Sequence, residues 1–140
     1  MTVKQFAIAC IATTAVFLGL DALWLTAMTD ALYRPALGHL MRERVAPGPA
    51  IAFYAIYMVG IVGLAVAPAL RQRDWRSALG KGALLGLVAY ATYDLTNQAT
   101  LKGWPWHVTL IDLCWGMFAT AAAAASGCWF ASRAGGQGRG

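Results

Sequence analysis

Three aspartates stand in stretches of the chain that are otherwise almost entirely apolar. They are Asp21 in "LDALWL", Asp94 in "YDLTN" and Asp112 in "IDLCWG". An unpaired charge in an apolar medium is very costly, and no Lys or Arg lies beside these three acids. Acids in such places are candidates for function, because they usually face a bundle interior or a wet cavity. We therefore take Asp21, Asp94 and Asp112 as candidate catalytic residues that donate or accept protons.

Aromatic and amide side chains recur around these acids at helical spacing. A tryptophan follows Asp21 and Asp112 by three residues in each case, and Asn97 follows Asp94 by three. Such intervals place the side chains on one helix face. They predict a polar pocket whose ligand-binding residues are Trp24, Tyr54, Tyr57, Tyr90, Tyr93, Asn97 and Trp115.

The residue types allow several kinds of chemistry. Three carboxyl groups could carry out acid–base catalysis, hold a divalent cation through oxygen ligands, or relay protons coupled to a solute. A structural role is the alternative, in which each acid is hydrogen-bonded to Tyr, Asn or Thr and locks the helices together. No HExxH, CxxC, Walker or GxSxG motif is present, so no metal site is predicted and any cofactor stays unknown.

Composition indicates a membrane protein. Of 140 residues, 59% are hydrophobic and 12% are charged, whereas a soluble domain carries about 25% charged residues. The net charge of +5, in a chain this apolar, favours anionic lipid headgroups over nucleic acid as neighbours.

Four apolar segments occupy most of the chain, at about 5–28, 49–70, 77–101 and 106–132. Each exceeds the ~20 residues that cross a bilayer as a helix. We predict an all-α fold, a four-transmembrane-helix bundle that forms a single integral membrane domain over 1–132. The Gly-rich residues 133–140 are expected to be a disordered tail.

The first loop has a pattern of its own. After a turn expected at "YRP", the run "ALGHLMRERV" places its apolar residues on one stripe and its charged residues on the other side. This spacing predicts an amphipathic helix that lies in the membrane interface. The apolar stripe consists of Leu37, Leu40, Met41 and Val45.

Basic residues predict the orientation of the bundle, because Lys and Arg concentrate on the cytoplasmic side. With both termini cytoplasmic, that side carries Lys4, Arg71, Arg73, Arg76, Lys81, Arg133 and Arg139. The other side carries Arg34, Arg42, Arg44 and Lys102. The three acids then lie about six residues, or about 9 Å, below the outer edge, so they share one layer.

Five stretches resemble a family of small bacterial membrane proteins known as domain of unknown function 2177. They are "LDALWL", "LYRPALGHLM", "PAIAFYAIYMVGIVGLAVAPAL", "GLVAYATYDLTNQATLKGWP" and "LIDLCWG". The resemblance implies four spans and a bacterial inner (plasma) membrane location. It implies no activity and no catalytic residues.

Three functions are compatible with this pattern, and the sequence does not decide whether the protein is an enzyme. The first is binding or modification of a lipid-like or other hydrophobic small molecule in an acidic-aromatic pocket that opens to the outer leaflet. The second is proton-coupled transport, alone or as a transporter subunit, for which a homo-oligomer would be needed to form a path. The third is a structural partner of a membrane enzyme.

Overall fold

The computed structural model describes residues 1–136, and these residues are almost entirely helical, with no strand among them. The elements are α1 (Val3–Met28), the π-helical η1 (Thr29–Tyr33), α2 (Arg34–Leu37), the 3₁₀ turn η2 (Gly38–Leu40), α3 (Pro47–Gly60), the π-helical η3 (Ile61–Val66), α4 (Ala67–Gln72), α5 (Trp75–Thr100) and α6 (Trp106–Gly136). Four continuous helical segments result, as the sequence predicts.

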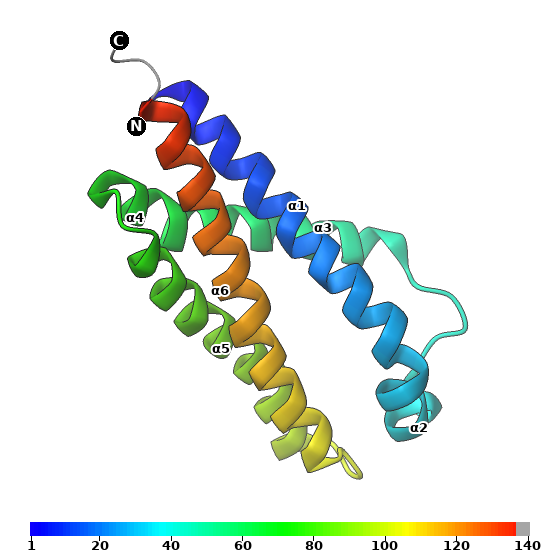
Figure 1. The fold of residues 1–140 in the computed structure, drawn as a ribbon. Coiled ribbons are helices and arrows are strands. Elements are labelled where there is room, and N and C mark those ends of the chain that lie inside the picture. The colour runs from blue at the N-terminus through cyan, green and yellow to red at the C-terminus, as the bar shows by residue number, and fades with distance from the viewer. Residues whose placement is uncertain (137–140) are drawn as a thin grey trace.

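The four segments form a bundle in which α6 is central (Figure 1). It packs along α5 on one side and along α1 on the other, antiparallel to both. The segment α3–η3–α4 crosses behind them at a steep angle. The N-terminus and the end of α6 lie at one end of the bundle, and the α5–α6 turn lies at the opposite end.

Local sequence signals set where the helices begin. The Thr2 hydroxyl accepts a hydrogen bond from the Gln5 backbone N–H at 3.2 Å, and the Gln5 side chain accepts one from the Thr2 N–H at 2.9 Å. This is a capping box, which supplies partners for N–H groups that a helix start leaves free. Asp74 caps α5 by accepting from the Arg76 N–H at 2.9 Å. Gly103 has φ +77°, which the tight turn between α5 and α6 requires.

Three helical stretches are long and apolar enough to cross a membrane: Val3–Leu40, Pro47–Gln72 and Trp106–Gly135. The helix α5 has 26 residues but is not apolar enough to join them. The Gly, Thr and Asp residues of α5 lower its mean hydropathy. The helix packs against α6 along the bundle.

Both π-helical segments end two residues before a proline. The segment η1 ends at Tyr33, before Pro35, and η3 ends at Val66, before Pro68. A proline inside a helix has no N–H to donate, and its ring clashes with the carbonyl four residues earlier. A wider turn relieves that clash, and local π adjustments accommodate prolines in membrane helices. The chain therefore passes both prolines without breaking the helix.

This continuity corrects the prediction for the first loop. No turn forms at "YRP", and helical structure runs from α1 through η2 to Leu40. Residues 41–46 are not helical, so the expected amphipathic stripe is cut short. Leu37 is buried, while Leu40, Met41 and Val45 are exposed. The buried apolar residues here face Trp104 and Val108 instead of a membrane interface.

The end of the chain also differs from the prediction. Residues 133–136 of the expected disordered tail belong to α6, which continues to Gly136. The Arg133 guanidinium lies over the Trp129 ring one turn earlier, 4.0 Å from its centroid, and this contact favours the extra turn. Residues 137–140 lie outside the described part of the chain.

Small residues bring α5 and α6 into close contact, as small-residue stripes do in membrane helices. A Cβ added to Gly86 would stand 2.1 Å from the Gly116 carbonyl oxygen, and one added to Gly82 would stand 2.8 Å from the Thr120 carbonyl oxygen. Neither position leaves room for a methyl group. Backbone therefore meets backbone along this interface.

We expect Gly86→Ala to lower the free energy of unfolding by about 3 kcal/mol, at the upper end of overpacking costs, because the new methyl would meet a carbonyl of the backbone. Gly80→Ala is the matched control on the same helix, since a Cβ there meets nothing within 4 Å. Its free energy of unfolding should equal that of wild type or exceed it by up to about 1 kcal/mol, because alanine favours a helix more than glycine does. Reversible denaturant unfolding in micelles measures both. Equal stability of the two variants would contradict the close contact.

Candidate functional site

The buried carboxyl groups of Asp94 on α5 and Asp112 on α6 are neighbours. Asp94 is fully buried and Asp112 is 6% exposed, and the charge of Asp112 acts on Asp94 at close range. Within residues 1–136, no protein group donates to either oxygen of Asp94. Ionised carboxylates carry acceptors only, so this pair can form a hydrogen bond only when one member holds a proton.

Asp112 is the end of a hydrogen-bonded chain that starts on α1. The Trp24 indole N–H donates to the Tyr33 hydroxyl at 2.9 Å, and the Tyr33 hydroxyl donates to Asp112 Oδ1. Tyr33 lies in the π-helical segment η1. One polar chain therefore joins α1, η1 and α6.

Asp21 on α1 has a separate partner. The Tyr54 hydroxyl of α3 donates to Asp21 Oδ2, and Asp21 is only 7% exposed. Tyr54 is half-buried. The Asp21–Tyr54 contact ties α3 to α1, while the Asp94–Asp112 contact ties α5 to α6. Each of the four helical segments thus contributes a polar side chain to one buried layer, which we call the aspartate layer and define as Asp21, Tyr33, Tyr54, Asp94 and Asp112.

Trp24 and Trp115 do not form the opposite walls of an open pocket. Their rings stack on each other with centroids 4.3 Å apart and planes 8° apart. The stacked pair fills the space between α1 and α6. On its outer side lies an apolar groove of about 440 Å³, which no aspartate lines. The predicted acidic-aromatic pocket is therefore corrected to a buried acidic layer beside aromatic grooves.

The remaining predicted residues occupy different positions. Tyr90 lies in the electrostatic neighbourhood of both Asp21 and Asp112, and its ring covers Gly116, where an added Cβ would stand 2.3 Å from ring carbons. Tyr57 bonds to the Thr120 hydroxyl at 2.8 Å and not to an acid. Tyr93 is 59% exposed, and Asn97 is half-buried beside it.

A second groove, of about 410 Å³, lies between α3 and α5. It is lined by Phe53, Ala89, Tyr90 and Tyr93. Tyr90 and Tyr93 neighbour the aspartates, so these rings stand between the groove and the aspartate layer.

Sequence reasoning missed Tyr33, which is the direct partner of Asp112. Tyr33 is nine residues after Trp24, about two and a half turns of a regular α-helix, so an unbroken α-helix would put the two side chains on opposite faces. The π turns of η1 change that register. The sequence signal that could have indicated this change of register was Pro35 within an apolar helical run.

Another polar cluster holds the α5–α6 turn. Trp104 donates from its indole N–H to the Thr109 hydroxyl at 3.0 Å, and that hydroxyl donates to Gln98 Oε1 at 2.9 Å. The Gln98 amide donates to the Trp104 carbonyl at 2.8 Å. This closed ring of bonds fixes the end of the hairpin next to the aspartate layer.

Beyond the aspartate layer, toward the chain termini, the centre of the bundle is mostly apolar, with Thr13 and the hydrogen-bonded Tyr57–Thr120 pair as its buried polar groups. Phe17, Ile61 and Ala65 are fully buried there, with further alanines of α6 around them. Within residues 1–136, no three His, Cys, Asp or Glu side chains come together to surround one metal ion.

The helical spans and the buried acidic layer define a helical membrane protein. The family model described as "Predicted membrane protein (DUF2177)" matches residues 6–129, and the chain belongs to this family. This confirms the resemblance seen in the sequence. Comparison with curated proteins found no match, and neither did comparison with solved structures.

We expect Tyr33→Phe to lower the free energy of unfolding by about 1 kcal/mol. The substitution leaves both Trp24 and Asp112 without their shared hydrogen-bond partner. A buried unpaired group costs about 1–3 kcal/mol, and a hydrogen bond in a membrane protein contributes about 0.6 kcal/mol on average. The expected loss lies between these values. Tyr93→Phe, which removes a phenol from an exposed ring, should change stability by less than about 0.5 kcal/mol. The measurement is denaturant unfolding in micelles.

A double-mutant cycle of Tyr33→Phe with Trp24→Phe isolates the chain from the Trp24–Trp115 stacking. The two substitutions should be non-additive, because either one breaks the same bond. Additive effects would mean that the Trp24–Tyr33 bond does not form.

Proposed function

We propose that the protein binds a lipid-like molecule in the groove between α3 and α5, with the aspartate layer exchanging protons or hydrogen bonds with its polar end. The observation that carries the proposal is the contact between Asp94 and Asp112, two buried carboxyl groups with no cation beside them. A purely structural role is a poor explanation of this pair, because membrane hydrogen bonds stabilise little.

The pair shares one proton in this proposal, because two like charges in contact cannot both ionise. Asp94 then acts as the proton donor or acceptor toward the ligand. Asp112 is held in place by Tyr33. Asp21, held by Tyr54, is the third acid of the site.

The groove supports a ligand that is mostly apolar with a small polar end. Phe53, Tyr90 and Tyr93 offer ring faces to chains or fused rings, and the two phenols neighbour the acids. Tyr54 carries its hydroxyl from the same helix as Phe53 to Asp21. A headgroup with a hydroxyl or amine would reach phenols first and carboxyl groups behind them. Trp24, Tyr57, Asn97 and Trp115 support the site by packing and hydrogen bonding rather than by contact with the ligand.

The apolar core below the acids favours binding over proton-coupled transport. A transport path would need a continuous line of polar groups through the bundle. Phe17 and Ile61 are fully buried in this region, and the Tyr57 and Thr120 hydroxyls there are bonded to each other. Thr13 lies beyond them and has no hydrogen-bond partner among the described residues.

We place the protein in a bacterial inner membrane as a single domain over 1–132, with both termini cytoplasmic. The basic residues at the end that holds the N-terminus support this orientation. The helix α5 crosses the bilayer alongside α6 in this proposal. Its Asp94 is buried against protein, and its exposed Thr92 and Thr96 hydroxyls donate to carbonyls of α5 itself. The α5–α6 turn and the groove then lie toward the outer leaflet.

The groove is tested by filling it. Ala89→Phe places a ring where Ala89 now lines the groove, and Ala22→Phe, at an exposed alanine of α1, is the matched control. We expect a lipid-like molecule to co-purify with wild type and with Ala22→Phe in nanodiscs. The amount bound per protein should be at least about tenfold lower in Ala89→Phe. Native mass spectrometry and analysis of extracted lipids measure it. Retention by Ala89→Phe, or no enrichment in wild type, would refute the proposal.

The role of the acid is tested separately. Asp94→Asn keeps the shape of the side chain and removes its exchangeable charge, and Asp30→Asn is the control at an exposed acid. If the aspartate layer handles protons, Asp94→Asn should fold like wild type yet lose the co-purifying molecule, and complementation of a deletion strain should fail. If Asp94→Asn retains the molecule and complements the deletion strain as well as wild type does, only a packing role remains for the aspartates.

A further inference from the structure

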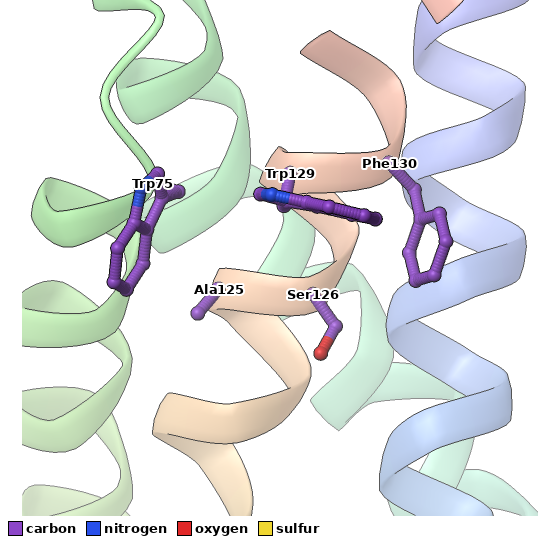
Figure 2. A pocket seen from close by; sticks show the side chains of 5 residues that line it. All are labelled: Trp75, Ala125, Ser126, Trp129 and Phe130. Atoms are coloured by element: carbon purple, nitrogen blue, oxygen red, sulfur yellow. The ribbon is translucent and has the colours of Figure 1, made fainter. Parts of the chain in front are cut away.

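An aromatic groove lies at the end of the bundle that holds both the N-terminus and the end of α6, far from the aspartate layer. Figure 2 shows Trp75 from α5 and Trp129 from α6 at the same level, with Ala125 and Ser126 on α6 beside them. The groove has a volume of about 360 Å³. Phe130 closes the far side of the groove. Its ring is edge-on to that of Trp129, with the two ring centroids 4.7 Å apart.

Two arginines stand at the rim of this groove on the faces of its tryptophans. The Arg133 guanidinium lies 4.0 Å from the centroid of the Trp129 ring, and that of Arg76 lies 5.6 Å from the Trp75 ring. Neither pairs with a carboxylate of residues 1–136, where the ion pair present is Arg34–Asp30 at the other end. Cation–π contact limits the positions of the guanidinium groups without neutralising them.

We propose that this groove binds one anionic phospholipid, with an acyl chain between Trp75 and Trp129 and the phosphate between Arg76 and Arg133. The groove supplies apolar ring surface, and its rim supplies two cations that form no ion pair with an acid of the described chain. The nearby acid, Asp74, is engaged in capping α5. Arginine binds phosphate through several N–H donors at once. The charge of the rim therefore complements an anionic headgroup and not a zwitterionic one.

The surroundings strengthen this charge preference. The start of α1, the end of α4 and the turn into α5 lie at this end of the bundle (Figure 1). These segments carry Lys4, Arg71 and Arg73 against one acid, Asp74, so the approach to the groove is basic. Basic residues next to a membrane attract anionic lipid headgroups. Ser126, which lines the groove, adds a hydroxyl.

The test is native mass spectrometry of the purified full chain, titrated in a neutral detergent with dioleoyl phosphatidylglycerol or dioleoyl phosphatidylcholine. Wild type should retain one phosphatidylglycerol in preference to phosphatidylcholine. Arg76→Gln with Arg133→Gln should reduce that preference about thirty-fold, which corresponds to about 1 kcal/mol for each arginine. Arg42→Gln with Arg44→Gln removes the same charge at the opposite end and should leave the preference unchanged.

A further variant tests the groove itself. Ser126→Leu fills the groove and leaves both arginines in place, so it should reduce phosphatidylglycerol binding while leaving the fold intact. Inorganic phosphate at millimolar concentration should not displace the lipid, because the acyl chain contributes to binding. The proposal is overturned if the Arg76 and Arg133 double variant keeps the wild-type preference, or if the Arg42 and Arg44 variant loses as much. Displacement by phosphate alone, or full binding by Ser126→Leu, would equally overturn it.

Discussion

Carboxyl groups inside an apolar bundle must find their hydrogen-bond partners within the protein, and this constraint decides how the four helical segments meet. Asp21 takes a donor from α3, and Asp112 takes one from η1. Asp94 receives no hydrogen bond from the described residues and has the carboxyl group of Asp112 as a close neighbour. These contacts join α1 to α3, η1 to α6 and α5 to α6. The aspartate layer therefore acts as a set of cross-links as well as a candidate site.

The layer can form because α5 and α6 approach closely. Gly82 and Gly86 leave no gap between the two backbones, which brings Asp94 and Asp112 together farther along the same interface. The ring of bonds through Gln98, Trp104 and Thr109 then fixes the hairpin end. Close packing and polar pairing thus depend on each other in this half of the molecule.

Much of this arrangement follows from the sequence. Apolar run lengths predicted four helical segments. Spacing predicted Asp21, Asp94 and Asp112 at one depth, and all three are buried inside the bundle. These properties depend on local composition and on the regular rise of a helix, which a single sequence carries.

The partners of the acids could not be predicted in the same way. The π turns at η1 bring Tyr33 to Asp112, and their cause is the steric effect of Pro35 on a helix that continues past it. The stacking of Trp24 on Trp115 depends on the distance between α1 and α6, which no spacing along one helix reveals. Tyr57 faces Thr120 for the same reason. Contacts between helices therefore decide whether the acids line an open pocket or form a closed layer, and positions along a single helix do not reveal those contacts.

The shared proton of the Asp94–Asp112 pair is the central claim, and infrared spectroscopy of the purified protein tests it most directly. At neutral pH the spectrum should contain a carbonyl stretch of a protonated carboxyl group that shifts in D₂O. That band should be absent from Asp94→Asn and unchanged in Asp30→Asn. A wild-type spectrum with ionised carboxylates alone, or a protonated band that persists in Asp94→Asn, would contradict the account.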